Sequence, residues 1–263
     1  MYNFKQNIFL RILLACLCIL ILTGCTKTVD LSNHDEKRKN IEDKYGITIS
    51  YGNDKIEDKK IASYQLYSDT SELDRILDDI DQYFSKLPNG FLEELTSYNK
   101  DNKTKVNIVI TKKDYLGVSF ELEGTEYWLI GDGDVKMDIA SDMIYSVMVH
   151  IKKSDDKDGF LNEWNNYNPT EFRYGQGSKF KKYLFGTADS ENCYFITGET
   201  MDNSIDEIEG LFSTLWDDEC IEEYKKNNLP KIDAKLKYIC DELKRVFETV
   251  DDDAYWGRYF IGK

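Results

Sequence analysis

The sequence is poor in histidine, proline and positive charge. Its 263 residues include 2 His and 3 Pro, and 34 Lys and Arg stand against 49 Asp and Glu, so the formal net charge is −15. Binding to nucleic acid depends on cationic side chains that neutralise phosphates, so this balance argues against a nucleic-acid partner. Two His also limit the metal and acid–base chemistry that the chain can host. Hydrophobic residues reach 41% and aromatic residues 13%, which excludes a disordered chain and allows a sizeable core.

The first 25 residues have the layout of a bacterial export signal. Lys5 and Arg11 precede or border an apolar run, 12–22, that is too short to span a bilayer, because a spanning helix needs about 20 apolar residues. The run ends in Leu22-Thr23-Gly24-Cys25, which resembles the lipobox of bacterial lipoproteins, where the Cys thiol is alkylated by a diacylglycerol. The alternative is an ordinary signal peptide that contains a Cys. We expect residues 1–24 to be a signal peptide and 25–40 a lipidated polar tether.

Cleavage before Cys25 would leave 239 residues, and the loss of Lys5 and Arg11 would take the formal net charge to −17. An anionic membrane repels such a body, so the lipid itself has to hold it. Two acyl chains, palmitate among them, suffice for stable anchoring. We therefore expect an extracytoplasmic protein anchored by lipid to the bacterial cell membrane. The remaining thiols, Cys193, Cys220 and Cys240, fit neither a disulfide framework nor a zinc pattern, and we expect them in the core.

Residues 41–263 have the pattern of a single α+β domain. Alternating and helical hydrophobic spacings predict strands or extended stretches at 47–51, 63–68, 106–110, 127–130 and 135–139, and helices at 35–45, 69–87, 91–98, 205–216 and 232–250. Everything after residue 141 has a helical pattern. Strands first and helices later predict a small N-terminal mixed sheet with helices, followed by a mainly helical C-terminal half.

Several segments occur in an order that resembles a known family. They are Lys44-Tyr45-Gly46-Ile47, Leu87-Pro88-Asn89-Gly90-Phe91, the stretch 138–150, then Trp164, Asn168-Pro169 and Phe172-Arg173-Tyr174, and the stretch 187–193. This order is similar to that of a family of bacterial lipoproteins described as zinc-binding metallopeptidases, which have a gluzincin-like layout. The resemblance covers about residues 41–256 and implies a zincin-like fold.

The resemblance fails at the residues that carry the family's chemistry. Zinc peptidases of this kind need an H-E-x-x-H helix, because two His at i and i+4 point the same way and the Glu acts as general base. The corresponding residues here are Ser146-Val147-Met148-Val149-His150. Ser146 stands at the first ligand position and Val147 at the general-base position. The family's third ligand would correspond to Glu191.

A weak zinc site from His150 and Glu191 stays open, although no cofactor is expected. Each residue also has an ordinary interpretation: His150 as a partly buried helix residue, Glu191 as a surface or helix-cap residue. His34 lies in the expected tether and cannot be recruited. Cys193, two residues beyond Glu191, should point elsewhere. On the 138–150 helix we expect Ile144, Val147, Met148 and Ile151 to pack inward.

Two functions from different classes follow. The first is a zincin-like lipoprotein that has lost catalysis and acts as a binding or surface protein, with a peptide or protein as its ligand. The alternative is an active zinc metallopeptidase with a rearranged site. A solute-binding lipoprotein with two α/β lobes is disfavoured by the helical C-terminal half.

Overall fold

The computed structural model describes residues 32–56, 61, 64, 66–97, 105–112, 119–122, 124–153 and 157–255. The signal segment and Cys25 therefore lie outside the described residues. In chain order the first elements are α2 (Ser32–Tyr45), β1 (Thr48–Ser50), α3 (Thr70–Phe84), α4 (Phe91–Thr96), β2 (Lys105–Ile110), β3 (Ser119–Leu122) and β4 (Thr125–Ile130). They are followed by the helices α5 (Val135–Lys153), α6 (Lys157–Asn166), α7 (Ser204–Thr214), α8 (Asp218–Asn227) and α9 (Pro230–Val246).

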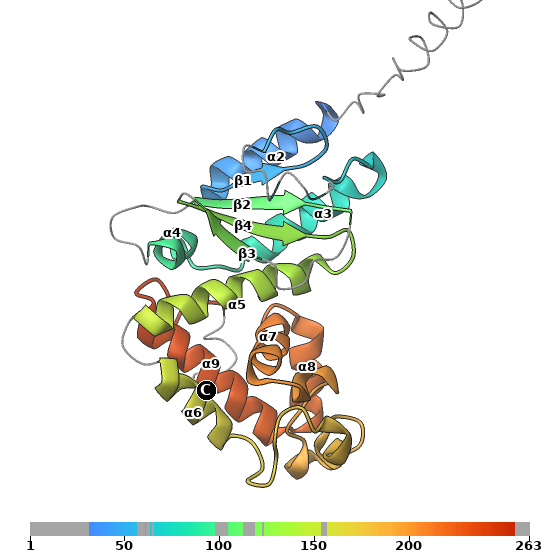
Figure 1. Cartoon of the computed structure of the whole chain (residues 1–263), viewed down its shortest axis with the longest axis vertical. Coiled ribbons are helices and arrows are strands. Elements are labelled where there is room, and N and C mark those ends of the chain that lie inside the picture. Colours follow the sequence, from blue (N-terminus) through green and yellow to red (C-terminus); the bar gives the residue numbers. More distant parts are fainter. Residues whose placement is uncertain are drawn as a thin grey trace, which may run out of the picture. The chain divides into compact units, whose positions relative to one another are not determined.

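The four strands form one mixed sheet in the order β1-β2-β4-β3 (Figure 1). β1, β2 and β4 are parallel, with Ile49 opposite Ile108 and Ile108 opposite Trp128, whereas the edge strand β3 runs antiparallel to β4. Helices dominate the chain from residue 135 onward. The expected α+β class, with a small N-terminal mixed sheet and a mainly helical C-terminal half, is confirmed.

Both faces of the sheet are buried. Ile108 and Trp128 project into the main core, which the helices complete. Val109 and Leu129 project to the opposite face and pack with Ile61 in a separate cluster. Because side chains alternate along a strand, neighbouring residues of β2 and β4 belong to different clusters.

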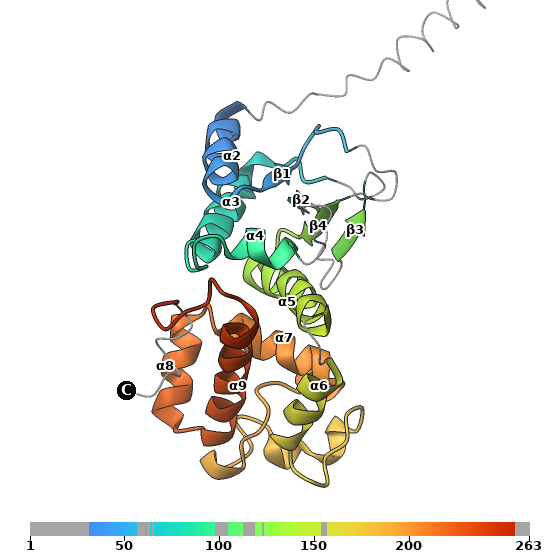
Figure 2. The ribbon, with the colours of Figure 1, turned by 90° about the vertical axis from the view of Figure 1, so that its left-hand side faces the viewer.

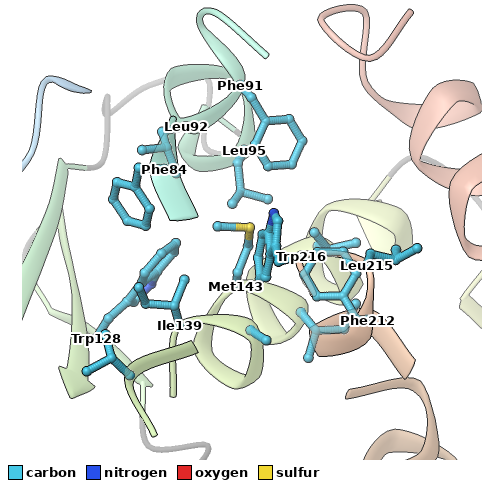
Figure 3. Packing of buried hydrophobic residues seen from close by; sticks show 14 of the residues in the cluster. Phe84, Phe91, Leu92, Leu95, Trp128, Ile139, Met143, Phe212, Leu215 and Trp216 are labelled. Atoms are coloured by element: carbon cyan, nitrogen blue, oxygen red, sulfur yellow. The ribbon is translucent and has the colours of Figure 1, made fainter. Parts of the chain in front are cut away.

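The main core continues without interruption from the sheet to the C-terminal helices. Figure 3 shows Trp128 and Phe84 on one side of Met143 and Trp216 on the other, with Met143 projecting from α5. All four side chains are at most 1% exposed. Helix α5 therefore forms the middle layer of one core, and Figure 2 shows it between the sheet and the bundle of α7, α8 and α9.

Helix α5 corrects two of the sequence predictions. The expected strand at 135–139 is its first part, because Val135, Ile139 and Met143 bury one face at the four-residue spacing of a helix. Asp134 supports this start, since its Oδ1 accepts the N–H of Met137 at 3.0 Å. In addition, the region after residue 141 is not all helical. Between α6 and α7 the chain forms irregular loops with short 3-10 turns.

Helix α2 begins at Ser32, so residues 32–40, expected to be part of a polar tether, are helical. His34 is buried on this helix, and its Nδ1 lies 2.7 Å from Asp74 Oδ1 on α3. Arg38 binds Asp54 at 2.7 Å. Residues 34–40 thus belong to the folded body. In the part of the chain that the structure describes, no helix combines the length and the apolar character needed to cross a membrane.

The other expected elements are found with small shifts. Helix α3 is capped by Asp69, whose side chain accepts the Ser71 N–H, and it ends at Phe84, three residues before the predicted end. Helix α9 begins at Pro230, two residues before the predicted start, and ends at Val246, four residues before the predicted end. Of the predicted extended stretch at 63–68, residues 63 and 65 lie outside the described set, and Leu66 forms a single bridge to Thr111. Strand β3 was not anticipated.

Candidate functional site

The residues that correspond to the zinc-binding pentapeptide lie on the second half of α5. Ser146 is buried, and its hydroxyl donates a hydrogen bond to Glu126 Oε1 on β4. The indole Nε1 of Trp128 donates to the same oxygen at 2.8 Å. The hydroxyl is therefore directed into the sheet, where it helps to satisfy a buried carboxylate. It is engaged away from any surface that a metal ion could reach.

Val147 occupies the position where a metallopeptidase would carry its general base. The side chain is 2% exposed and belongs to the main core, together with Ile144 at 2% and Met148 at 7%. The expectation that these three pack inward is confirmed, whereas the side chain of Ile151 lies outside the described residues. An apolar side chain in the core can neither accept a proton from water nor deliver one to a leaving group.

His150 lies one turn after Ser146 and is partly exposed. Its ring centroid is 4.5 Å from that of Phe247, just beyond α9, and Phe247 in turn contacts Phe91 of α4 at 5.0 Å. His150 is thus part of an aromatic contact that joins α4, α5 and the end of α9.

Glu191 lies elsewhere in the fold. It is exposed in a single 3-10 turn, η4 (Ser190–Asn192), which Asp189 caps by accepting the Asn192 N–H, so the expected helix is absent at this place. The same segment contacts the first half of α9, where Tyr194 O accepts a hydrogen bond from Lys235 at 2.7 Å. Lys235 and Phe247 are 12 positions apart, about 18 Å along a helix. The structure therefore places Glu191 and His150 near opposite ends of α9.

The donor set does not fit a resident zinc ion. Among the described residues, no group of three or more His, Cys, Asp and Glu side chains has the spacing to hold a metal. Cys193 is buried, and its Sγ is directed to the carbonyl of Phe195, as expected of a residue that points away from a metal site. Structural and catalytic zinc sites use three or four protein ligands in tetrahedral geometry, and we derive no chemical step through zinc.

The segment from Trp164 to Tyr174 has a structural role instead. Trp164 Nε1 donates to Glu207 Oε2 at 2.9 Å, the Tyr174 hydroxyl donates to the same oxygen, and Asn168 Nδ2 donates to Tyr174 at 2.9 Å. Lys235 Nζ binds the other oxygen of Glu207 and also Asn168 Oδ1, the latter at 2.6 Å. The side chains of Glu207 and Lys235 are 1% and 0% exposed. This buried ion pair joins α7 and α9 to the irregular segment after α6.

The sequence analysis did not identify Glu207 or Lys235 as important residues, although the position of Lys235 in the hydrophobic pattern pointed to its burial. It lies three residues after Ile232 and four before Ile239, which places it on the apolar face of α9. A Lys on such a face needs a buried partner. Burial lowers the pKa of Lys235, and Glu207 opposes that shift.

Another buried acid lies one turn before Ser146. Asp142 is 0% exposed, and neither carboxylate oxygen has a hydrogen bond of ordinary geometry. Burial raises its pKa well above the ordinary value, and the neighbouring Asp138 adds to the shift. The Leu129 backbone opposes the rise without reversing it. Glu126 and Glu209 also face this group and raise its pKa further. The raised pKa makes Asp142 a poorer ligand for a cation than an ordinary carboxylate.

Comparisons with known proteins give one structural likeness. No family model matches the chain, and a search of curated proteins finds no match. A solved structure from Bacteroides caccae, described as a "putative zinc-binding metallo-peptidase", is similar in fold. It shares 12% sequence identity and a TM-score of 0.47, over 87% of this chain and 93% of the other. The α+β architecture assigned above rests on the strand order and the continuous core of this chain itself.

Proposed function

We propose that this chain is a lipid-anchored extracytoplasmic lipoprotein whose metallopeptidase-like domain binds a ligand without cleaving it. The observation that carries the proposal is Val147, buried in the core where a zinc peptidase would present its general-base Glu. Ser146 supports it, because its hydroxyl is committed to Glu126. His150 is then the single residue of the motif that a zinc ion could use.

The missing zinc ligand at Ser146 and the missing general base at Val147 affect different parts of catalysis. A zinc peptidase depends on the metal to polarise the scissile carbonyl and on the Glu to activate water, and each contribution is worth several kcal/mol. Loss of the first ligand removes metal affinity, and loss of the Glu removes proton transfer. Either loss alone would slow hydrolysis by orders of magnitude, since each 1.4 kcal/mol is about a factor of ten in rate.

The anchor follows from the sequence Leu22-Thr23-Gly24-Cys25 after a short apolar run. A diacylglycerol on Cys25 would hold the body at the outer surface of the membrane despite its negative charge. The folded body begins at α2, so few residues separate it from the lipid.

Metabolic labelling with an alkyne-bearing fatty acid tests the anchor. The wild-type chain should be labelled and should sediment with membranes, and Cys25→Ser should lose both properties. Cys18→Ser is the matched control, because Cys18 leaves with the signal segment and should not affect labelling. Equal labelling of Cys25→Ser and wild type would contradict the proposal.

Incubation of the purified chain with an unfolded protein substrate tests the second half of the proposal. We expect no cleavage above that of a heat-inactivated sample. Cleavage that a zinc chelator abolishes and added zinc restores would favour the alternative, an active metallopeptidase with a rearranged site.

A further inference from the structure

A cavity of about 650 Å³ lies at the amino ends of the parallel strands, away from the zinc-motif residues. It is lined by the end of α2 and the start of β1, by the loop between α3 and α4, by α4 itself and by the first residues of β2. Figure 1 shows α4 at this end of the strands. The size is that of pockets that hold small organic ligands. Two of the family-like segments, 44–47 and 87–91, line it, whereas none of the described α5 residues does.

The floor of the cavity is apolar and its rim is polar. Phe84, Phe91 and Val106 lie beneath the floor, since each is at most 3% exposed in total, and the apolar surface that a ligand can reach comes from Leu87 and Pro88. Leu87 and Pro88 form a half-buried wall. Ser85 and Asn89 add polar groups at the surface, and so does the backbone of the loop that carries them. A purely aliphatic ligand would leave these polar groups without partners, which favours a ligand with amide groups of its own.

The charges at the rim are opposite in sign to the chain as a whole. Lys44 and Lys105 line the cavity with one acid, Glu93, although acids outnumber bases in the sequence. Lys44 is held by Asp81 at 2.8 Å. Lys105 is exposed and forms no ion pair with another of the described residues. The β1–β2 register, with Thr48 opposite Asn107, places Lys105 beside the turn that follows α2.

We propose that this cavity binds the carboxyl terminus of a peptide whose last side chain is apolar. Lys105 would pair with the terminal carboxylate, and the apolar side chain would pack against Leu87 and Pro88. This inference rests on the proposed binding function and gives it a site and a ligand class. The site does not involve His150, so the two claims can fail separately.

Fluorescence anisotropy with a labelled pentapeptide that ends in Ala-Leu-Phe tests the proposal on the full chain in detergent. The peptide with a free carboxylate should bind saturably, and the same peptide with a C-terminal amide should bind at least tenfold more weakly. Lys105→Gln should remove most of this difference, whereas Lys179→Gln, an exposed lysine outside the cavity, should preserve it. Leu87→Trp should fill the cavity and weaken both peptides. His150→Ala should change neither.

Several outcomes would overturn the proposal. Equal affinities for acid and amide, or an unchanged preference in Lys105→Gln, would exclude recognition of the carboxylate. Binding of dodecanoate without binding of the peptide would assign the cavity to an acyl chain instead. Circular dichroism melting of each variant shows that it is folded. Chelator-sensitive cleavage of the peptide would count against the proposed function, whereas intact but unbound peptide would count against this cavity alone.

Discussion

Replacement of Lys235 by Met should unfold the protein at a much lower temperature, because it would leave Glu207 as a buried carboxylate without its cation. The side chains of the pair are 0% and 1% exposed, so solvent cannot replace the lost partner. Removal of one member of a buried ion pair costs about 3–5 kcal/mol. For a chain of this size, each kcal/mol lowers the melting temperature by about 2–4 °C, so we expect a decrease of roughly 6–20 °C.

Two further variants separate the buried charge from the lost packing. Lys235→Met combined with Glu207→Gln should recover part of the stability, because Gln can still accept hydrogen bonds from Trp164 and Tyr174 without a buried negative charge. Lys237→Met, an exposed neighbour on α9, should change stability by less than about 0.5 kcal/mol. Differential scanning calorimetry measures all three. A melting temperature for Lys235→Met equal to that of Lys237→Met would refute this reasoning.

Two other predictions concern α5. Val147→Glu should destabilise the chain by about 2–7 kcal/mol, because it would bury a neutral carboxyl group without a hydrogen-bond partner in the core. Tyr145→Glu, on the exposed side of α5, should have little effect, and equal stability of the two variants in urea would place Val147 at the surface. The carboxyl of Asp142 has a raised pKa in the folded state, so the folded chain binds this proton more tightly than the unfolded chain does. Wild-type stability should therefore fall as the pH rises from 3.8, the ordinary pKa, towards the raised value. Asp142→Asn has no such proton, so it should become more stable relative to wild type over the same pH range. Urea unfolding at several pH values measures the difference in stability, and a difference that does not change with pH would contradict a raised pKa of Asp142.

The sequence predicted those elements whose local signals agree with their packing. The apolar spacing of Leu73 to Phe84 identified α3, and that of Ile232 to Leu243 identified α9. Strand β4 was found because it is apolar and short. These elements bury one face in the main core, so the hydrophobic pattern contains most of the information needed.

The sequence predictions were wrong where the same residues fit two structures and contacts with distant parts of the chain decide between them. The alternation of Val135, Met137 and Ile139 resembles a strand, but the core formed with α3 and α7 selects the helical face of Val135 and Ile139. His34 lies in a charged segment that has the composition of a tether, and its burial depends on Asp74, 40 residues away. No local pattern contains such a contact.

The candidate site could be predicted only in part. The sequence identifies Ser146, Val147 and His150 as one turn of a helix, and the structure places them on α5 as expected. The sequence could not give the bond between Ser146 and Glu126, which joins a helix to a strand, or the distance along α9 that separates Glu191 from His150. The partner of Lys235 was likewise hidden, because Glu207 lies on another helix.

Zinc content is the measurement that tests the central claim most directly. The full chain would be purified, equilibrated with zinc, dialysed, and analysed by inductively coupled plasma mass spectrometry beside His150→Ala. We expect far less than one zinc per chain in both proteins, because tight binding needs three or four ligands in fixed geometry and this site offers His150 alone. One zinc per wild-type chain that is lost in His150→Ala, together with chelator-sensitive cleavage of an unfolded protein, would contradict the account and establish a working metallopeptidase.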